Sequence, residues 1–328
     1  MIISRTPFRV SFFGGGTDFP DFYQEHGGVT LLTAIDKYCY ISLHRLSRFF
    51  KHRYRASYSR TESVLEPSEF QHPLIRECLG YRSPDCGLEI SHVSDLPGRT
   101  GLGSSSSFTV GLLHALHALA GDRVTEEDLA RQAIHIERER VGDAGGHQDQ
   151  YAAAYGGFVR VAFGPGPGIT VTRLPLSSSR IQTLEDNTMM FFTGVESSAE
   201  EVLTEQKKNT ARNHATLLTM KEMAERAEQI LVGTGDLDEF GALLHESWML
   251  KRSLSSGISN AAIDTHYDTA IKHGALGGKL LGAGGRGFLL VWAHPDRHSA
   301  IRKGLEGLQE VDFRCCPVGS RIIFQDPE

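Results

Sequence analysis

The chain has 328 residues, a formal net charge of −6 and an isoelectric point of about 6.2, and its hydrophobic and charged fractions of 40% and 23% are those of an ordinary globular protein. This length suits two domains, and the mild acidity gives no electrostatic basis for a nucleic-acid partner. No apolar run approaches the roughly 20 residues of a membrane-spanning helix. Five scattered cysteines without paired metal spacing indicate reduced thiols. We therefore expect a soluble, cytoplasmic protein with neither membrane nor nucleic acid as a partner.

The first half of the chain alternates apolar runs rich in β-branched residues with helical periodicity. Residues 48–60 are basic and aromatic, and a solvated strand or hairpin face explains them better than nucleic-acid contact. The patterns predict strands at 2–13 (broken by Pro7), 29–46, 87–93, 158–163 and 169–174, and helices after 107, at 125–141 and from 148.

The second half is dominated by helical patterns. A serine-rich stretch at 176–179 indicates a linker, so we predict two α+β domains, residues 1–180 and 181–328. The elements expected after it are a strand at 189–193, helices at 199–231, 237–250 and 260–273, a glycine-rich loop at 277–287, a strand at 288–293, a helix at 299–308 and a strand at 320–324.

A glycine- and serine-rich loop at 97–107 precedes an amphipathic helix. Glycines let backbone amides point inward, the helix N-terminus adds its positive dipole end, and serine hydroxyls add donors, so the loop is typical of a phosphate site. Leu102 and the helix that follows argue against a flexible linker. Neither the GxxxxGK[ST] pattern nor the third glycine of the dinucleotide fingerprint is present here.

Three motifs resemble those of the GHMP kinases, the family of galactokinase, homoserine kinase and mevalonate kinase. They are the loop at 97–106, the segment 7–18, and the segment 279–288. The resemblance implies a ribosomal-protein-S5-like N-terminal domain, a ferredoxin-like C-terminal domain, and ATP with Mg²⁺ as cofactors. It assigns ATP binding to Pro97, Gly101, Leu102, Gly103, Ser104, Ser105, Ser106 and Ser107.

The third motif departs from the family at Arg286, where another glycine is usual. Its Gly282, Gly284 and Gly287 also fit GxGxxG, but the predicted order of helix, loop and strand excludes the dinucleotide interpretation.

Phosphoryl transfer needs an acid near the phosphates for Mg²⁺ and a carboxylate near the acceptor hydroxyl. By the resemblance, Ser105 and Glu137 are metal ligands, Asp149 is the catalytic base, and Arg9 lies beside that base. On the residues alone, Glu137 would fit a solvated charged face and Asp149 a helix cap. His147 is an alternative base on chemical grounds.

Within the family the chain is similar to the D-glycero-D-manno-heptose 7-phosphate kinases, on residues 12–18, 146–157 and 248–254. Galactokinases carry an acidic residue and a histidine where this chain has Gly15 and Gly16. The similarity implies phosphorylation of the anomeric hydroxyl to give heptose 1,7-bisphosphate, for capsule or lipopolysaccharide. The expected substrate residues are Gly15, Gly16, Thr17, Asp18, Lys251, Lys279, Gly284 and Arg286, with Arg252 as a further cation for the 7-phosphate.

Two alternatives stay open. One is a fucose- or galactose-type free-sugar 1-kinase, which needs no phosphate pocket. The other is a non-catalytic sensor of sugar and ATP, although the trio Ser105, Glu137 and Asp149 argues against it. A homodimer is also left open.

Overall fold

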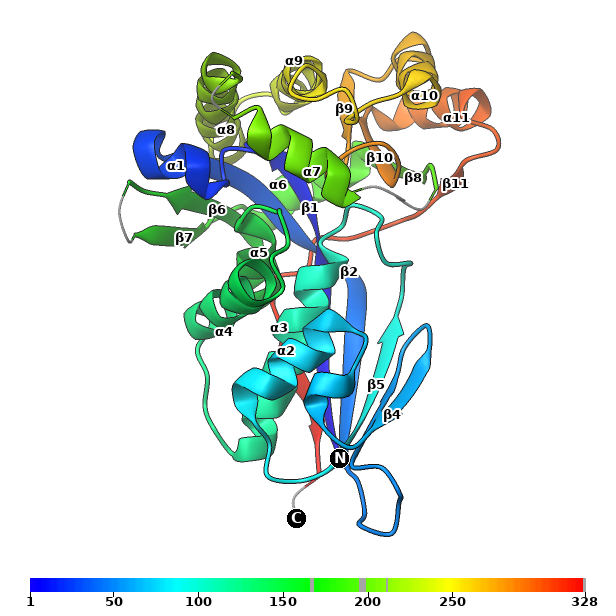
Figure 1. Cartoon of the computed structure of the whole chain (residues 1–328). Coiled ribbons are helices and arrows are strands. Elements are labelled where there is room, and N and C mark those ends of the chain that lie inside the picture. The colour runs from blue at the N-terminus through cyan, green and yellow to red at the C-terminus, as the bar shows by residue number, and fades with distance from the viewer. Residues whose placement is uncertain (166–167, 195–198, 211, 327–328) are drawn as a thin grey trace.

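The structure is a computed structural model that describes residues 1–165, 168–194, 199–210 and 212–326. Its larger sheet has eight strands, and its path runs β12-β1-β2-β5-β3-β4, with β6 pairing with β2 and β7 pairing with β6 (Figure 1). The bounds are β1 Ile2–Phe13, β2 Gly28–Arg45, β3 Tyr54–Ser57, β4 Thr61–Val64, β5 Leu88–Ser94, β6 Phe158–Phe163, β7 Ile169–Arg173 and β12 Arg321–Gln325.

Strand β2 organises this sheet because it is 18 residues long. One edge pairs with β1 along most of its length, while the other edge pairs with β6 at residues 28–33 and with β5 at residues 39–45. The strand is rich in β-branched and aromatic residues, which favour a pleated, buried surface. Its first eight residues are all buried, as expected for a strand covered on both faces.

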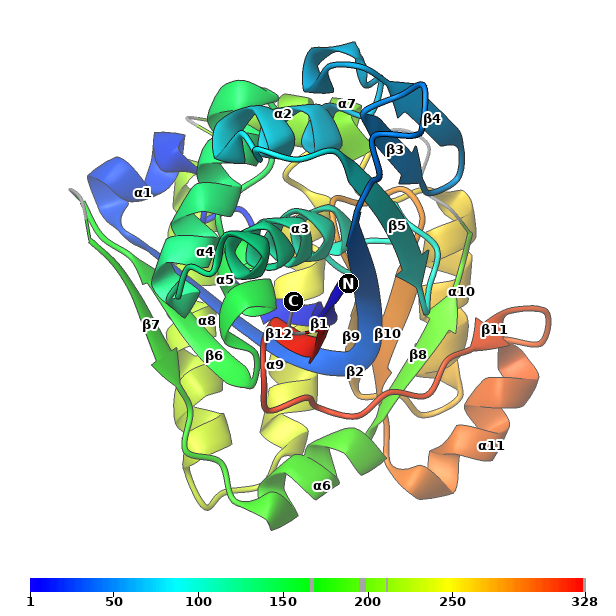
Figure 2. The ribbon, with the colours of Figure 1, turned by 90° about the horizontal axis from the view of Figure 1, so that it is seen from below.

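Helices cover this sheet on one side, where α3 packs against β1 and β2, and α5 packs against α3 and α4 (Figures 1 and 2). The helices of the first half are α1 Pro20–His26, the short 3₁₀ helix η1 Pro67–Glu69, α2 Pro73–Arg82, α3 Ser104–Ala120, α4 Glu126–Ile134, the π-helical η2 His135–Arg140 and α5 Gln148–Tyr155. Thr125 begins α4 by accepting a hydrogen bond from the Asp128 amide, as the sequence predicted.

A second, antiparallel sheet of four strands has the order β11-β8-β10-β9. Helix α9 contacts both sheets, at β1 and at β9, and α8 packs against α9 and against β1 and β2. The bounds are α6 Ser178–Asp186, β8 Thr188–Phe192, α7 Ala199–Lys208, α8 His214–Val232, α9 Asp238–Arg252, α10 Ala261–Lys272, β9 Gly277–Leu280, β10 Phe288–Trp292, α11 Pro295–Gly304 and β11 Gln309–Glu310.

The chain returns to its first sheet at its end, because β12 pairs antiparallel with β1 and brings the two ends of the chain close together (Figure 1). The last strand thus belongs to the sheet of the N-terminal half, although the predicted boundary at residues 180 and 181 assigns it to the second domain. The mixed α and β content in two units confirms the predicted fold class.

Several predicted elements were wrong in detail. Strand β1 continues through Pro7, where only a shift in register marks the proline. The expected linker at 176–179 leads directly into α6, because Ser177 caps that helix. The helix expected at 199–231 is two helices, α7 and α8, and Ala211 between them lies outside the described residues.

The third motif was also misassigned in part. Residues 277–280 form strand β9, so the order is strand, loop and strand, and no helix follows the glycines, which still excludes the dinucleotide interpretation. Helix α11 begins at Pro295 rather than at 299, because proline is favoured in the first turn of a helix.

Candidate functional site

The loop at 97–103 ends at the N-terminus of α3, and Gly101 and Gly103 have φ of 80° and 73°, values that favour glycine. A Cβ at Gly101 would lie 2.3 Å from the Leu281 carbonyl oxygen, so glycine also permits close contact with the third-motif loop. Among the described residues no side chain caps α3. Its first-turn amides therefore suit an anion.

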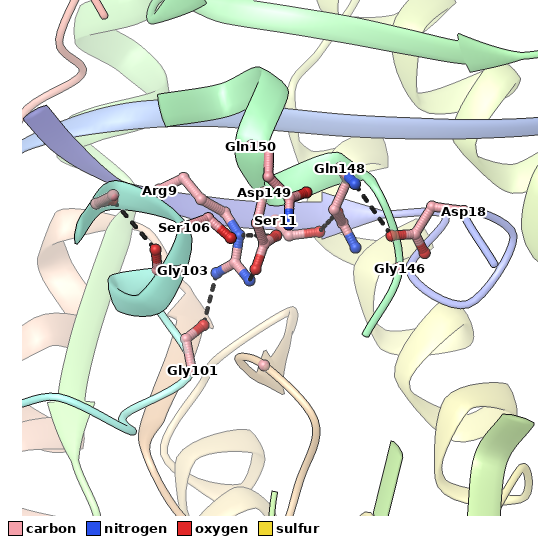
Figure 3. Close-up of polar contacts among 12 residues, drawn as sticks. Arg9, Ser11, Asp18, Gly101, Gly103, Ser106, Gly146, Gln148, Asp149 and Gln150 are labelled. Atoms are coloured by element: carbon pink, nitrogen blue, oxygen red, sulfur yellow. Dashed lines mark hydrogen bonds and ion pairs between the residues drawn. The ribbon is translucent and has the colours of Figure 1, made fainter. Parts of the chain in front are cut away.

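Arg9 of β1 and Asp149 of α5 form a bidentate ion pair beside this loop. Arg9 Nε and Nη2 donate to Asp149 Oδ1 and Oδ2 at 2.7 and 2.8 Å, and Arg9 Nη1 donates to the Gly101 carbonyl at 2.6 Å (Figure 3). The Arg9 side chain is 6% exposed and that of Asp149 is 22% exposed. The guanidinium thus fixes a partly open carboxylate at a set position from the phosphate loop.

Glu137 lies in η2 and is 1% exposed. Its Oε2 accepts hydrogen bonds from Ser106 Oγ at 3.0 Å and Gln150 Nε2 at 2.8 Å, whereas the buried Oε1 has no hydrogen-bond partner among the described residues. Burial raises the pKa of this carboxyl group. Glu137 is therefore not part of a solvated charged face.

An orphaned, buried carboxylate oxygen near the phosphate loop fits a divalent cation. Mg²⁺ is commonly bound by one or two carboxylates together with substrate phosphates and waters, so a cage of protein ligands is not needed. In the described part of the chain no cluster of three or more His, Cys, Asp or Glu could hold a metal. The serine brought to Glu137 is Ser106, while Ser105 is exposed in the first turn of α3, and its metal role stays a prediction.

Asp18 lies on the other side of Asp149, 2% exposed. Its Oδ1 accepts from the Gly16 amide at 2.9 Å and its Oδ2 from the Gln148 amide at 3.3 Å (Figure 3). Burial raises the pKa of Asp18, and the charge of Asp149 acts in the same direction. A Cβ at Gly146 would lie 2.0 Å from the Asp18 carboxylate, so the loop before α5 closes directly over it.

The neighbouring Thr17 and Gly16 support this loop. The Thr17 hydroxyl contacts the Gly14 and Val29 carbonyls at 2.8 and 3.0 Å, which occupies it within the backbone. Gly16 has φ of 107°, and a Cβ there would lie 2.6 Å from Gln206 of α7. At Gly15 a Cβ would lie 3.7 Å from Gln148 Nε2, in ordinary contact.

The predicted phosphate-binding lysines are buried and bonded to the backbone. Lys279 Nζ donates to the Ser11 and Phe12 carbonyls at 2.8 and 2.9 Å, and Lys251 Nζ donates to the Gly282 carbonyl at 2.8 Å. Burial lowers the pKa of Lys279 well below its usual value, and Lys251 adds to that shift. These contacts tie β9 to the end of β1, and α9 to the third-motif loop.

The remaining predicted residues of the second half are Arg286, Gly284 and Arg252. Arg286 is exposed on the third-motif loop, which contacts the phosphate loop where Gly287 meets Thr100. Gly284 lies against the backbone of Ile258, where a Cβ would be 2.4 Å from its Cα. Arg252 pairs with Asp264 at 2.8 Å.

His147, the alternative base, is half-buried, and Tyr23 Oη lies 3.0 Å from its Nδ1. Burial lowers its pKa to about 4, with Arg138 acting in the same direction. It is neutral near pH 7 and a weaker base than an ordinary histidine.

The sequence did not single out Ser11, Gln148 or Gln150. Gln148 Oε1 accepts from Ser11 Oγ at 2.7 Å, and Gln150 reaches Glu137, so the glutamines on either side of Asp149 fix the two sides of the site. In the sequence, Gln148 and Gln150 flank Asp149 at the start of a predicted helix, and this pattern could have indicated that both glutamines belong to the site.

Two sequence models of one family match the chain: the GHMP kinases N-terminal domain at residues 71–157 and the GHMP kinases C-terminal domain at 220–308. The chain belongs to the GHMP kinases. Among its relatives is the D-glycero-alpha-D-manno-heptose 7-phosphate kinase of Campylobacter jejuni, 29% identical over 95% of this chain and 96% of that protein.

A bifunctional fucokinase/GDP-fucose pyrophosphorylase of Arabidopsis thaliana is 29% identical over 70% of this chain but 22% of its own length. Among solved structures, a D-glycero-D-manno-heptose 1-phosphate kinase from Bacteroides thetaiotaomicron matches with a TM-score of 0.82 over 100% of both chains at 23% identity. This likeness confirms the two-domain GHMP kinase fold. Of the described helices, none has the length and apolar character to cross a membrane.

Proposed function

We propose that this GHMP kinase transfers the γ-phosphoryl group of ATP to the anomeric hydroxyl of D-glycero-D-manno-heptose 7-phosphate. The observation that carries the proposal is the position of Asp149, fixed by Arg9 between the phosphate loop and the Asp18 loop (Figure 3). A carboxylate so placed can face an acceptor hydroxyl while the phosphates lie on the α3 N-terminus. The nearly full-length similarity to a heptose 7-phosphate kinase supports this acceptor.

In the proposed reaction the anomeric oxygen attacks the γ-phosphorus, the bond between that phosphorus and the bridging oxygen breaks, and ADP leaves. Asp149 takes the proton of the hydroxyl. Arg9 holds both carboxylate oxygens of Asp149, so the base needs no reorientation during the transfer, and its charge offsets the negative charge that develops nearby. Asp18, bonded to the backbone through both oxygens, would accept from hydroxyls of the sugar.

Glu137, with Ser105 or Ser106, would hold Mg²⁺ beside the phosphates. The ion supplies neutralisation of phosphate charge when bound. The orphaned Glu137 Oε1 supports this role, and a cation there would also relieve the cost of burying the carboxylate.

A free-sugar 1-kinase is the second candidate, because the fucokinase relative is equally identical over the part that it shares. Such an enzyme would use the same base and phosphate loop and differ only in how it holds the far end of the sugar. We place the reaction in the cytoplasm, where ATP is available, and assign the product to the supply of activated heptose for capsule or lipopolysaccharide.

The test is coupled ADP release with Mg²⁺-ATP and a sugar panel: the heptose 7-phosphate, the unphosphorylated heptose, sedoheptulose 7-phosphate, fucose, galactose and mannose. We expect the heptose 7-phosphate to give the highest kcat/KM, and phosphorus NMR of the product to show a second phosphate on the anomeric carbon. Preference for a free sugar would replace the acceptor and keep the kinase. Binding of ATP and sugar without ADP release would instead indicate a sensor.

A further inference from the structure

A cavity of about 430 Å³ lies beyond Asp18, between α1, the loop before α5, and α7. Phe19 and Pro20 line one wall, Gly142–Gly145 and His147 another, and Thr204, Lys207 and Lys208 the third. Helices α1 and α7 lie side by side at this edge, where Lys207 Nζ and Asp21 Oδ2 are 3.9 Å apart (Figure 1). The mechanism proposed above makes no use of this cavity.

The loop that ends at His147 borders both the cavity, through Gly145 and His147, and Asp18, through Gly146. A Cβ at Gly146 would lie 2.0 Å from Asp18 Oδ2, and a Cβ at Gly145 would lie 2.7 Å from a guanidinium nitrogen of Arg138, which lines the cavity. Because neither glycine has a Cβ, the Asp18 carboxylate can lie against Gly146 and the Arg138 guanidinium against Gly145.

The groups of the site lie in a row, from the phosphate loop through Asp149 to Asp18. Gly101 of the phosphate loop lies on one side of the Arg9–Asp149 pair, and Gln148, Asp18 and Gly146 lie on the other (Figure 3). The cavity adjoins Gly145 and His147, at the end away from the phosphate loop. A sugar with its anomeric hydroxyl at Asp149 would extend its opposite end in this direction.

The cavity lining carries more positive than negative charge. Its cations are Arg138, Lys207 and Lys208, and its carboxylates are Asp21 and Asp143. Arg138 Nη2 donates to the Gly146 carbonyl at 2.7 Å and lies 3.6 Å from Glu137 Oε2, and Arg138 Nη1 lies 3.2 Å from Asp143 Oδ2. The Lys207–Asp21 pair is long and about half exposed, so it holds Lys207 weakly. Lys208 has no ion-pair partner in the described part of the chain.

We propose that this cavity is the subsite for the phosphate ester at the far end of the acceptor, with Lys207, Lys208 and Arg138 as its cations. The inference rests on the proposed sugar kinase activity and names what would select a phosphorylated sugar over a free one. Lys251 and Lys279, the lysines indicated by the sequence, donate to backbone carbonyls, and Arg286 lies on the loop beside the phosphate loop. The α7 lysines therefore replace them as candidates for this contact.

The test uses the Lys207→Ala/Lys208→Ala double variant of the full chain, with Lys272→Ala as the matched control, an exposed lysine on α10. Binding of the heptose 7-phosphate and of the unphosphorylated heptose is measured by calorimetry with a non-hydrolysable ATP analogue, and turnover is measured in parallel. We expect the wild type and the control to bind the phosphorylated sugar at least about tenfold more tightly than the free sugar, because each hydrogen bond between charged groups typically contributes such a factor. The double variant should lose this preference.

A wild type that has no preference for the phosphorylated sugar, or a double variant that keeps the preference, would overturn the subsite. If the wild type turns over the heptose 7-phosphate in that case, the proposed function stands without the subsite. If the wild type binds the phosphorylated sugar more tightly but turns over only free sugars, the acceptor assignment fails while the subsite is retained. Equal weakening of both sugars in the double variant would indicate general damage to α7 and count against the proposal.

Discussion

The two sides of Asp149 are built differently. The proposed nucleotide side consists mainly of backbone: two left-handed glycines, the N-terminus of α3, and the third-motif loop packed against them. The proposed acceptor side consists of side chains from segments far apart in sequence, with Asp18 after β1, Gln148 on α5 and, around the adjoining cavity, the proposed lysines of α7. Arg9 links the two, since it bonds to Asp149 and to Gly101.

This difference has a physical consequence. Every ATP presents the same phosphates, so amides fixed by glycines and a helix dipole can bind them without a charged side chain at a set position. A sugar is distinguished by where its hydroxyls and any second phosphate lie, and this needs directional side chains. The acceptor side is therefore where relatives with one fold can differ in substrate.

The largest effect should come from the group between the two sides. We expect Asp149→Asn to lower kcat by about a thousandfold, because an amide cannot take the acceptor proton and general-base catalysis contributes factors of this order. Affinity for ATP should change little, since the side-chain oxygen of the introduced asparagine can still accept from Arg9, and Arg9 keeps its bond to the Gly101 carbonyl. Steady-state ADP release gives kcat, and calorimetry gives the affinity for ATP.

The matched control is Asp268→Asn, an exposed aspartate on α10. It makes the same chemical change far from Arg9 and should leave kcat and ATP affinity at the wild-type values. If Asp149→Asn kept near wild-type turnover, Asp149 would be removed from the mechanism, and His147 or direct transfer to phosphate would have to carry the proton.

The same contrast explains what the sequence could predict. The phosphate loop, α3 and Asp149 follow one another over about fifty residues, and glycine and serine spacing carries their geometry locally. The burial of Lys279 against the carbonyls of β1 joins residues 268 positions apart, and no local pattern encodes it. For the same reason the return of β12 to β1 and the meeting of α1 with α7 were not predictable from periodicity.

In the first turn of α3, the sequence could not predict which of two serines is buried. Ser105 and Ser106 are adjacent and chemically identical, but one is exposed and the other is bonded to Glu137. Their burial depends on how α3 packs against η2, which the serine run does not show. The resemblance assigned the metal to Ser105, and the structure brings Ser106 to the carboxylate.

Substituting these serines separately would sharpen this point. We expect Ser106→Ala to lower the free energy of unfolding by about 1 kcal/mol, because Glu137 loses a buried hydrogen bond. Ser105→Ala should leave stability near wild type, because its side chain is exposed, and should raise the Mg²⁺ concentration needed for half-maximal activity. Urea unfolding and a Mg²⁺ titration of turnover measure the two effects. A shift in Mg²⁺ requirement confined to Ser106→Ala would transfer the metal role to Ser106.

A last expected effect is the response of the acceptor side to acid, through His147. Its folded-state pKa of about 4 lies below the unfolded value near 6.5, because burial disfavours the charged ring. Between these values the unfolded chain binds more protons, so stability should fall as the pH is lowered from about 6.5 to about 4, and this contribution should be fully present above that window. His147→Gln should flatten the pH dependence of the unfolding free energy between about pH 6.5 and about pH 4, independently of its effect on stability at pH 7. The matched control is His44→Gln, at an exposed position on β2. An unchanged slope in the His147 variant would show that the ring is open to water in solution, and the loop over Asp18 would then be less closed than the structure has it.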